Sequence, residues 1–303
     1  MVTSSTIHGA WAVVLTSTNN YVKGVLALKH ALHDLHHSEY PLLVLYTSAV
    51  VPSVIETLKE LGCIVKEIKP ITPKGKVNYK FERFVDTWTK LSVWNQSGYD
   101  RLVLLDADML PLQNMDELMR LELPDKNWVA ASHACICNPQ KIDHYPVHWI
   151  PQNCAYTGET CVSPVPLNKK SSYFNSGLIV LTPDESKFSA MIDYLDSISD
   201  LNIYPFPDQD FLNEIFNKQW KPISFIYNAL KTLQWAHEPM WNLEKVKNIH
   251  YILNKPWDTD VNRTLSDLEE TYKPLYKLWW NSYSQISTTL SVDDVILSNS
   301  KRH

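Results

Sequence analysis

Short apolar runs alternate with segments of helical periodicity along the first third of the chain. The runs are rich in Val, Ile and Leu, and they occupy residues 11–16, 42–46, 63–68 and 101–105. A strand buried on both faces has a continuous apolar sequence, whereas a surface helix has one apolar stripe. Apolar residues recur at helical spacing in 21–35, and Pro52 and Gly62 mark the start and end of a second helix. The alternation predicts an α/β fold with a Rossmann-like, mostly parallel sheet and helices on both faces.

The second half of the chain is less regular. Strands are expected at 128–132, 178–181 and 247–251, and helices at 185–198, from 209 onward and at 266–283. Between them, residues 133–172 form a stretch rich in Pro, Asn and Cys, and insertions of this length are usually lids or binding loops. We predict a single domain over residues 1–288, followed by a tail at 289–303.

Composition limits the class of protein. The 303 residues carry a formal net charge of −5, which argues against a general nucleic-acid-binding protein. No apolar run approaches the roughly 18 residues of a membrane span, and the N-terminus has no basic stretch followed by an apolar core. We therefore expect a cytoplasmic protein that binds neither nucleic acid nor a membrane. The sequence leaves a homodimer open.

The cysteines do not predict a disulfide scaffold or a zinc site. Their odd number and wide scatter are unlike a disulfide framework. They are Cys63, Cys135, Cys137, Cys154 and Cys161. Cys135 and Cys137 invite a metal interpretation, but structural zinc sites usually have a CxxC-like spacing and a second ligand pair. The sequence alone therefore does not favour zinc at this position.

Asp106 and Asp108 follow the apolar run 101–105 directly. In open parallel sheets, ligands bind beyond the carboxyl ends of the strands. Two acids one residue apart on a turn can both face one hard cation, because Mg²⁺ and Mn²⁺ prefer oxygen ligands. The alternative is a solvated acidic turn with no ligand. Burying two unpaired carboxylates would be costly, so a cation is their natural partner.

Two further residues fit a site for a metal-bound phosphate. His250 ends a short apolar run and could complete the metal site through its neutral imidazole. Lys255 follows shortly after and could bind a phosphate group as a point charge. An ordinary core or loop histidine is the alternative for His250.

Two polar segments could contact a sugar. Residues 175–177 read Asn-Ser-Gly and are expected to form a polar turn before a strand, which could equally be ordinary turn chemistry. Asp208 and Gln209 stand at the start of an amphipathic helix. Their side chains could hold sugar hydroxyls, or an acid of this segment could be the N-cap of the helix.

Taken together and in this order, the motifs resemble the family 8 retaining glycosyltransferases, the group that includes glycogenin and the plant galactinol synthases. The similarity spans about residues 10–283. The matching segments are 15–17, 21–24, 89–91, 104–108, 174–177, 208–213, 227–228 and 250–257. The resemblance implies a single GT-A-type domain. Its nucleotide-binding half would be 10–132, its acceptor loop 133–172, and its sugar and acceptor half 173–288.

The resemblance also implies a role for each matching position. The expected cofactor is Mn²⁺, or alternatively Mg²⁺, and the metal ligands would be Asp106, Asp108 and His250. The groups binding the nucleotide would be Leu15, Thr16, Ser17, Tyr21, the Ala107 backbone, Asn254 and Lys255. Those around the donor sugar would be Lys90, Asn175, Ser176, Asp208 and Gln209. The catalytic candidates are Asp208, Gln209 and Lys90. Asp208 is the only carboxylate we can offer as a nucleophile, so we favour front-face attack over double displacement.

Within the family, the sequence is closer to the galactinol synthases. The tyrosine that glycogenin glucosylates on itself falls on Trp235 here, and no tyrosine lies between Tyr227 and Tyr251. We therefore expect transfer of galactose or glucose from a UDP-sugar to a small polyol such as myo-inositol. Three departures stand out: a shorter 250–255 stretch without the family's glycine, Asp208 in place of a glutamate, and a loosely matched insertion. A glycogenin-like priming enzyme and a catalytically silent UDP-sugar-binding protein remain alternatives.

Overall fold

The computed structural model describes residues 7–78, 86–159, 171–260, 265–288 and 290–300. Its main sheet has seven strands in the order β3-β2-β1-β4-β7-β6-β8. These strands are β1 (Gly9–Leu15), β2 (Leu42–Tyr46), β3 (Ile64–Glu67), β4 (Arg101–Leu105), β6 (Val129–His133), β7 (Phe174–Leu181) and β8 (Trp220–Ile223). β7 is antiparallel to both of its neighbours, and every other pair in this sheet is parallel. The predicted mostly parallel α/β sheet is confirmed.

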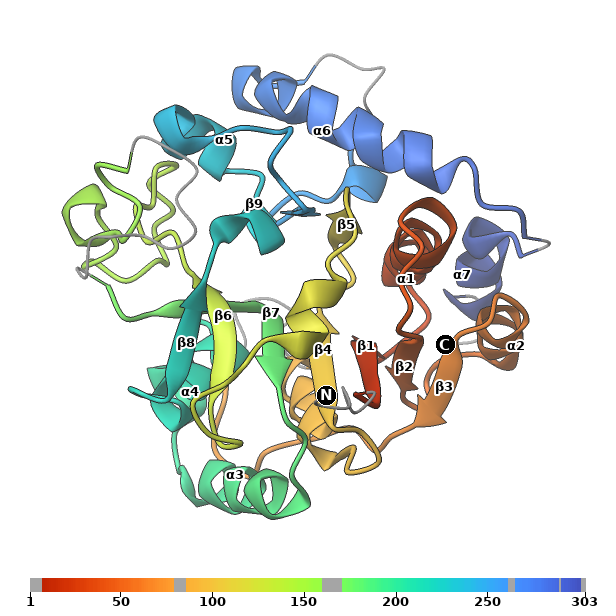
Figure 1. Ribbon diagram of the computed structural model, residues 1–303, viewed down its shortest axis with the longest axis horizontal. Coiled ribbons are helices and arrows are strands. Elements are labelled where there is room, and N and C mark those ends of the chain that lie inside the picture. The colour runs from red at the N-terminus through yellow and green to blue at the C-terminus, as the bar shows by residue number, and fades with distance from the viewer. Residues whose placement is uncertain (1–6, 79–85, 160–170, 261–264, 289, 301–303) are drawn as a thin grey trace, which may run out of the picture.

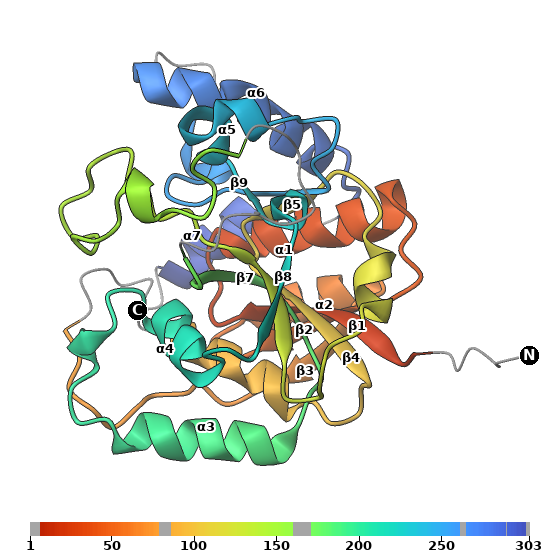
Figure 2. The ribbon, with the colours of Figure 1, turned by 60° about the vertical axis from the view of Figure 1, so that its left-hand side comes forward.

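Both faces of the sheet are buried, because alternate side chains along each strand enter different cores. In β1, Trp11 and Val13 belong to one core, and Ala10 and Ala12 belong to the other. The first core is covered by α1 (Tyr21–Lys29), its π-helical continuation η1 (His30–Leu35) and α2 (Pro52–Glu60). The second is covered by η3 (Thr87–Asn95), α3 (Glu185–Ser197) and α4 (Pro207–Ile215). Figure 2 shows α3 and α4 on the side of the sheet opposite α1.

A second layer lies beyond the carboxyl edge of the main sheet. It contains a three-stranded sheet of β5 (Met109–Pro111), β10 (Asn248–His250) and β9 (Ala229–Leu230), in that order. The helices of this layer are α5 (Leu233–Ala236) and the long α6 (Asp267–Tyr283), which packs along α1 (Figure 1). Aromatic side chains dominate the third core, including Tyr272, Tyr276 and Trp279 of α6. Ser266 caps α6, its hydroxyl accepting the Glu269 N–H at 3.4 Å.

Short 3-10 turns connect these elements. They are η4 (Asp116–Arg120), η5 (Pro151–Asn153), η6 (Leu201–Ile203), η7 (Phe225–Tyr227), η8 (Glu238–Met240) and η9 (Pro256–Asp258). Within the described ranges, no helix combines the length and the apolar character that crossing a membrane requires.

Two segments differ from the expectation. The expected polar turn at 175–177 is wrong, because these residues lie inside β7, which starts at Phe174 and pairs with His133 of β6. β7 is antiparallel to β4, so its first residues extend past the carboxyl end of β4 and can carry polar groups toward a ligand. The expected tail contains α7 (Val292–Ser300), whose Val292 is buried in the first core. Residues 160–170 of the insertion, with Cys161, lie outside the described residues.

Candidate active site

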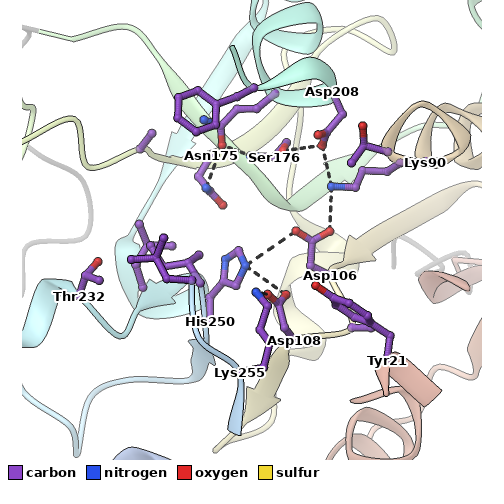
Figure 3. A pocket seen from close by; sticks show the side chains of 18 of the residues that line it. Tyr21, Lys90, Asp106, Asp108, Asn175, Ser176, Asp208, Thr232, His250 and Lys255 are labelled. Carbon is purple, nitrogen blue, oxygen red and sulfur yellow. Dashed lines mark hydrogen bonds and ion pairs between the residues drawn. The ribbon is translucent and has the colours of Figure 1, made fainter. Parts of the chain in front are cut away.

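A cavity of about 380 Å³ opens at the carboxyl edge of the main sheet (Figure 3). The loop after β1, the loop after β4, the start of β7, the start of α4 and the insertion all contribute walls. The predicted site residues that line the cavity are Leu15, Thr16, Ser17, Tyr21, Lys90, Asp106, Ala107, Asp108, Asn175, Ser176, Asp208, Gln209, His250 and Lys255. The fold thus brings together side chains from six separate stretches of the sequence.

Asn254 is the exception among the predicted residues. It is exposed and absent from the cavity wall, and its amide donates to Glu269 at 3.1 Å. The short 250–255 stretch turns without the family's glycine, because Leu253 itself adopts the left-handed conformation with φ 63°. The turn still delivers the Lys255 ammonium to the Asp108 carboxylate, with which it forms an ion pair.

The two acids and the histidine form one cluster. His250 Nε2 lies 3.2 Å from Asp108 Oδ1 and 3.8 Å from Asp106 Oδ2. One ligand atom from each residue falls within 4.8 Å of the other two. An octahedral ion with bonds of about 2.1 Å holds neighbouring ligand atoms roughly 3 Å apart. The separations in the cluster are therefore close to those of ligands around one divalent ion.

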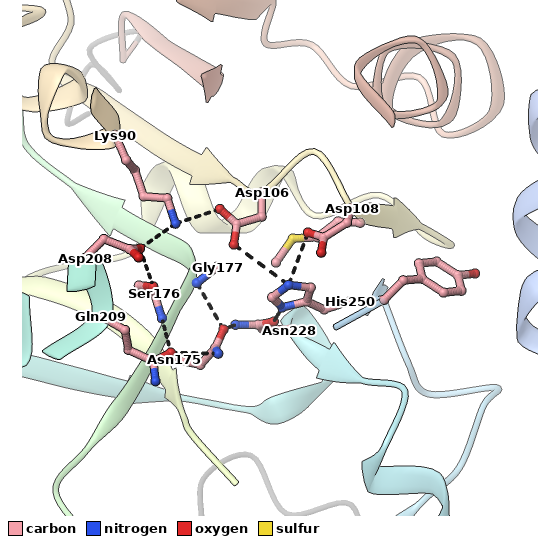
Figure 4. Close-up of polar contacts among 12 residues, drawn as sticks. Lys90, Asp106, Asp108, Asn175, Ser176, Gly177, Asp208, Gln209, Asn228 and His250 are labelled. Atoms are coloured by element: carbon pink, nitrogen blue, oxygen red, sulfur yellow. Dashed lines mark hydrogen bonds and ion pairs between the residues drawn. The ribbon is translucent and has the colours of Figure 1, made fainter. Parts of the chain in front are cut away.

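A chain of hydrogen bonds fixes the tautomer of His250 (Figure 4). Backbone N–H groups of Ser176 and Gly177 donate to Gln209 Oε1 and Asn175 Oδ1, at 3.2 Å and 3.0 Å. These contacts orient both amides, because only the oxygen of an amide accepts. Asn175 Oδ1 also accepts from Asn228 Nδ2 at 2.8 Å, which leaves Asn228 Oδ1 facing His250 Nδ1 at 2.8 Å. His250 Nδ1 must therefore carry a hydrogen and donate it.

This tautomer supports the metal assignment. With Nδ1 protonated, the lone pair of a neutral His250 sits on Nε2 and faces two carboxylates. That arrangement is repulsive unless a cation lies between them or the ring is protonated, and metal-bound histidines usually have their second nitrogen fixed in this way. Although burial opposes it, Lys255 and His250 hold the pKa of Asp108 well below its usual range. Burial raises the pKa of Asp106, with a further contribution from the Asp108 charge. The donor set fits Mn²⁺ or Mg²⁺.

Lys90 bridges one acid of the metal cluster, Asp106, and Asp208 at the start of α4. Its Nζ lies 2.8 Å from Asp106 Oδ1 and 2.7 Å from Asp208 Oδ2. Burial alone would lower the pKa of Lys90, but Asp106 and Asp208 raise it well above its ordinary value. Ser176 Oγ also donates to Asp208 Oδ2 at 2.8 Å. Asp208 is therefore engaged by a cation and a hydroxyl, and the N-cap of α4 is Phe206 rather than an acid.

The loop that carries the two acids packs tightly against α1. A Cβ at Gly24 would lie 2.0 Å from the Ala107 carbonyl oxygen, so only glycine allows this approach. At the start of the same helix, Tyr21 packs edge-on against Trp257, with ring centroids 5.3 Å apart. Tyr21 thus stands beside the acidic loop, at the end of the cavity that the loop after β1 forms (Figure 3).

Gly177 is a second position of the site where a side chain does not fit, and it yields a prediction. A Cβ there would lie 2.4 Å from His250 Cε1 and 2.8 Å from His250 Nδ1. We expect Gly177→Ala to displace the imidazole and weaken Mn²⁺ binding by about 10- to 100-fold. Isothermal titration of the purified protein with Mn²⁺ measures this. Gly98→Ala is the matched control, since a Cβ there meets nothing within 4 Å. Equal affinities for both variants would contradict the assignment.

Lys231 and Asn228 are site residues whose roles the sequence analysis did not identify. Lys231 is fully buried, and its Nζ donates to the Asn254 carbonyl at 2.7 Å and to the Tyr276 hydroxyl. It thus braces the turn that carries Lys255. Asn228 appeared only as part of a family motif, without a function. These two polar residues flank the apolar pair of β9, and their burial beside it could not be read from the sequence.

Lys231 also makes stability depend on pH. Burial lowers its pKa from 10.5 to about 8. Between these pH values the unfolded chain binds more protons than the folded one, so the free energy of unfolding should rise with pH. The expected slope is on the order of 1 kcal/mol per pH unit. Urea unfolding of the parent protein and of Lys231→Met at pH 8.0, 8.75 and 9.5 tests this. The parent should gain stability relative to the variant across the series, and parallel profiles would refute the assignment.

A cavity lined by cation-binding acids and lysines at the strand ends of an α/β sheet is typical of an enzyme acting on a phosphorylated ligand. Comparison with known proteins narrows this class. The profile described as "Glycosyl transferase family 8" matches residues 12–260, and the chain belongs to this family of glycosyltransferases.

Individual relatives agree with this membership. The chain is 32% identical to galactinol synthase 7 of Arabidopsis thaliana over 283 residues, covering 92% of this chain and 82% of the relative. It is 35% identical to galactinol synthase 1 of Solanum lycopersicum over 297 residues, covering 93% and 83%. Among solved structures, galactosyltransferase LgtC in complex with donor and acceptor sugar analogues superposes with a TM-score of 0.60. The identity there is 16%, over 92% of this chain and 98% of LgtC, and supports the predicted GT-A-type fold.

Proposed function

We propose that the protein is a retaining hexosyltransferase that uses Mn²⁺, or Mg²⁺, to transfer galactose or glucose from a UDP-sugar to a small polyol such as myo-inositol. One observation carries this proposal: the Asp106, Asp108 and His250 cluster lies beside Lys255 in one cavity that also contains Lys90 and Asp208. The galactinol synthase relatives support the choice of acceptor.

The two ends of the cavity suit the two parts of the donor. Tyr21 and the loop of residues 15–17 form one end, where the aromatic ring and backbone groups would hold uridine. Asn175, Asp208 and Gln209 form the other, where their carboxylate and amides would hold sugar hydroxyls. The diphosphate would lie between them, next to the metal cluster. Lys255 would release the Asp108 carboxylate and bind a phosphate oxygen of the donor instead, since either group offers an anionic oxygen to the ammonium.

A divalent ion bound by the two acids and His250 would neutralise the charge that develops on the departing diphosphate. Lys90 would hold Asp208 and Asp106 in place around the donor sugar. The Asp208 oxygen that contacts Lys90 also accepts the Ser176 hydroxyl, which makes this carboxylate a weak nucleophile. These contacts favour front-face attack. The acceptor oxygen would form a bond to the anomeric carbon while the bond between that carbon and the β-phosphate oxygen breaks and UDP leaves. The same β-phosphate oxygen would take the acceptor proton.

The insertion and Phe206 form a wall suited to a small acceptor. The Trp149 and Phe206 rings stack with centroids 4.7 Å apart and an interplanar angle of 10°, and Tyr145 packs edge-on against Phe206. All three residues line the cavity. Aromatic faces pack well against the C–H groups of a polyol or sugar ring. These rings therefore suit a small polyol or sugar as the acceptor.

The test is a matrix of donors and acceptors. UDP-galactose, UDP-glucose and UDP-GlcNAc are each incubated with myo-inositol, glucose or no acceptor, in Mn²⁺, Mg²⁺ or excess EDTA. We expect an α-linked hexosyl-inositol, identified by its anomeric coupling in NMR spectra, that forms with Mn²⁺ and not with EDTA. Intact-mass analysis of the protein runs alongside.

Three outcomes would overturn the proposal. Full activity in excess EDTA contradicts the metal site. Hexose units added to the protein indicate a glycogenin-like priming enzyme, and donor binding without turnover or hydrolysis indicates a silent binding protein. Trp235, which stands where glycogenin has its acceptor tyrosine, is 46% exposed and offers no hydroxyl.

A further inference from the structure

The chain carries a second cluster of metal-ligating side chains, separate in composition from the acidic one. It consists of Cys135, Cys137, Cys154 and His237, which share no residue with the first cluster. Cys135 and Cys137 follow β6, Cys154 caps η5, and His237 ends α5. Three separate segments of the chain therefore converge on one point. We propose that this point is a structural Zn²⁺ site with three thiolate ligands and one imidazole.

The distances are those of four ligands around one ion. His237 Nε2 lies 3.4 Å from Cys135 Sγ, 3.2 Å from Cys137 Sγ and 3.7 Å from Cys154 Sγ. Cys135 Sγ and Cys154 Sγ are 4.0 Å apart. A tetrahedral ion with Zn–S bonds of about 2.3 Å and a Zn–N bond of about 2.0 Å places sulfurs about 3.8 Å apart and each sulfur about 3.5 Å from the nitrogen. All four ligand atoms lie within 4.8 Å of one another.

A disulfide or a hydrogen-bonded cluster without an ion accounts less well for this arrangement. The sulfurs of Cys135 and Cys154 are about twice a disulfide bond length apart. A hydrogen on His237 Nε2 can point at only one of the three sulfurs that surround it. Cys137, Cys154 and His237 are also buried, so water has little access to their sulfur and nitrogen atoms. A common cation satisfies all four ligand atoms at once.

The ligand types select zinc over the ion proposed for the acidic cluster. Soft thiolates favour Zn²⁺, whereas carboxylates favour Mn²⁺ and Mg²⁺. An iron–sulfur cluster spreads its four ligands over two or more irons, and ligand atoms this close leave room for a single ion. With four protein ligands, the coordination is closed and leaves no open position for a substrate, which is typical of a structural site.

The position of the site indicates what the ion would do. Cys137 and Cys154 stand at the two ends of a loop whose Gln140, Tyr145 and Trp149 line the cavity. His237 anchors these ends to α5, next to the cavity residue Thr232. Few regular hydrogen-bonded elements hold this loop, since η5 is its one helical turn in the described part of the insertion. The zinc ion would therefore fix the insertion against the second layer.

The test begins with the parent protein, full length and without a polyhistidine tag. After expression with added Zn²⁺ and dialysis against EDTA, we expect about one zinc per chain by inductively coupled plasma mass spectrometry. Refolding with Co²⁺ should give thiolate-to-cobalt charge-transfer absorption and tetrahedral ligand-field bands. Removal of zinc with a mercurial and a chelator should make the 138–153 loop susceptible to limited proteolysis.

Variants then locate the ion. Cys137→Ser and His237→Ala should reduce the zinc content about tenfold or more, while His237→Cys should retain zinc through a four-thiolate site. Cys63→Ser is the matched control, because Cys63 is a buried thiol outside the cluster. Asp108→Asn should also keep its zinc. Parent protein without tightly bound zinc, equal zinc in Cys137→Ser, loss of zinc in Asp108→Asn, or a Cys135–Cys154 disulfide in peptide mapping would each overturn the inference. None of these measurements depends on the proposed transfer reaction.

Discussion

Asp108→Asn should reduce kcat/KM for hexosyl transfer by about 1,000-fold, because it removes a carboxylate from the metal cluster while preserving the shape of the side chain. Asp108 is buried and faces both His250 Nε2, at 3.2 Å, and the Lys255 ammonium. The amide that replaces it bears no charge and turns an NH₂ group toward one of these two partners. We therefore expect weaker Mn²⁺ binding as well as slower transfer, measured by isothermal titration and by initial rates in saturating acceptor.

A buried aspartate outside the cavity is the matched control. Asp116 accepts hydrogen bonds from Ser38 Oγ at 2.5 Å and from the Glu39 N–H at 2.8 Å. Asp116→Asn should lose stability but keep its Mn²⁺ affinity and its kcat/KM. If Asp108→Asn retained activity close to the parent enzyme while Mn²⁺ binding was unchanged, the metal site would have to be placed elsewhere.

Lys90→Met should destabilise the metal-free protein by about 3 kcal/mol, because it leaves the buried Asp208 and the partly buried Asp106 without their shared cation. The Lys90 side chain is 14% exposed, and its Nζ contacts Asp106 and Asp208 at 2.8 Å and 2.7 Å. Equilibrium urea unfolding in EDTA measures the loss. Saturating Mn²⁺ should restore part of it, since the ion supplies positive charge next to Asp106.

Two variants make this result specific. Lys59→Met removes a lysine from an exposed pair with Glu56 and should leave the free energy of unfolding almost unchanged. Lys90→Arg keeps the charge and should keep most of the stability, while its different shape should reduce kcat. A small effect of Lys90→Met, similar to that of Lys59→Met, would show that the carboxylates are neutralised in another way.

Local sequence patterns predicted most of the fold. The apolar runs around Val13, Val44 and Val103 became β1, β2 and β4 because strands buried on both faces need continuous apolar sequence. Helix limits also followed from local chemistry, as with Pro52 at the start of α2 and Gly62, at φ 86°, after its end. β7 was misjudged at its start because the polar residues there, which line the cavity, look like a turn in the sequence.

The site was predicted less completely than the fold. Asp106 and Asp108 could be recognised because both belong to one short segment after one strand. Asn254 was expected in the site, but it lies outside the cavity wall and bonds to Glu269, whereas Lys255, one residue on, contacts Asp108. The cluster of Cys135, Cys137, Cys154 and His237 was not predicted, because its members stand at spacings unlike those of known zinc motifs.

The sequence by itself determined the order of strands and helices, the family and the acidic motif, because each depends on residues close together in the chain or on a matching pattern. Tertiary structure alone decided the tautomer of His250, the bridge from Lys90 to Asp106 and Asp208, and the convergence of three cysteines on His237. Each of these joins segments that are far apart in sequence. A hydrogen bond or a coordination sphere depends on separations of a few ångströms, and only the packing of the two layers sets them.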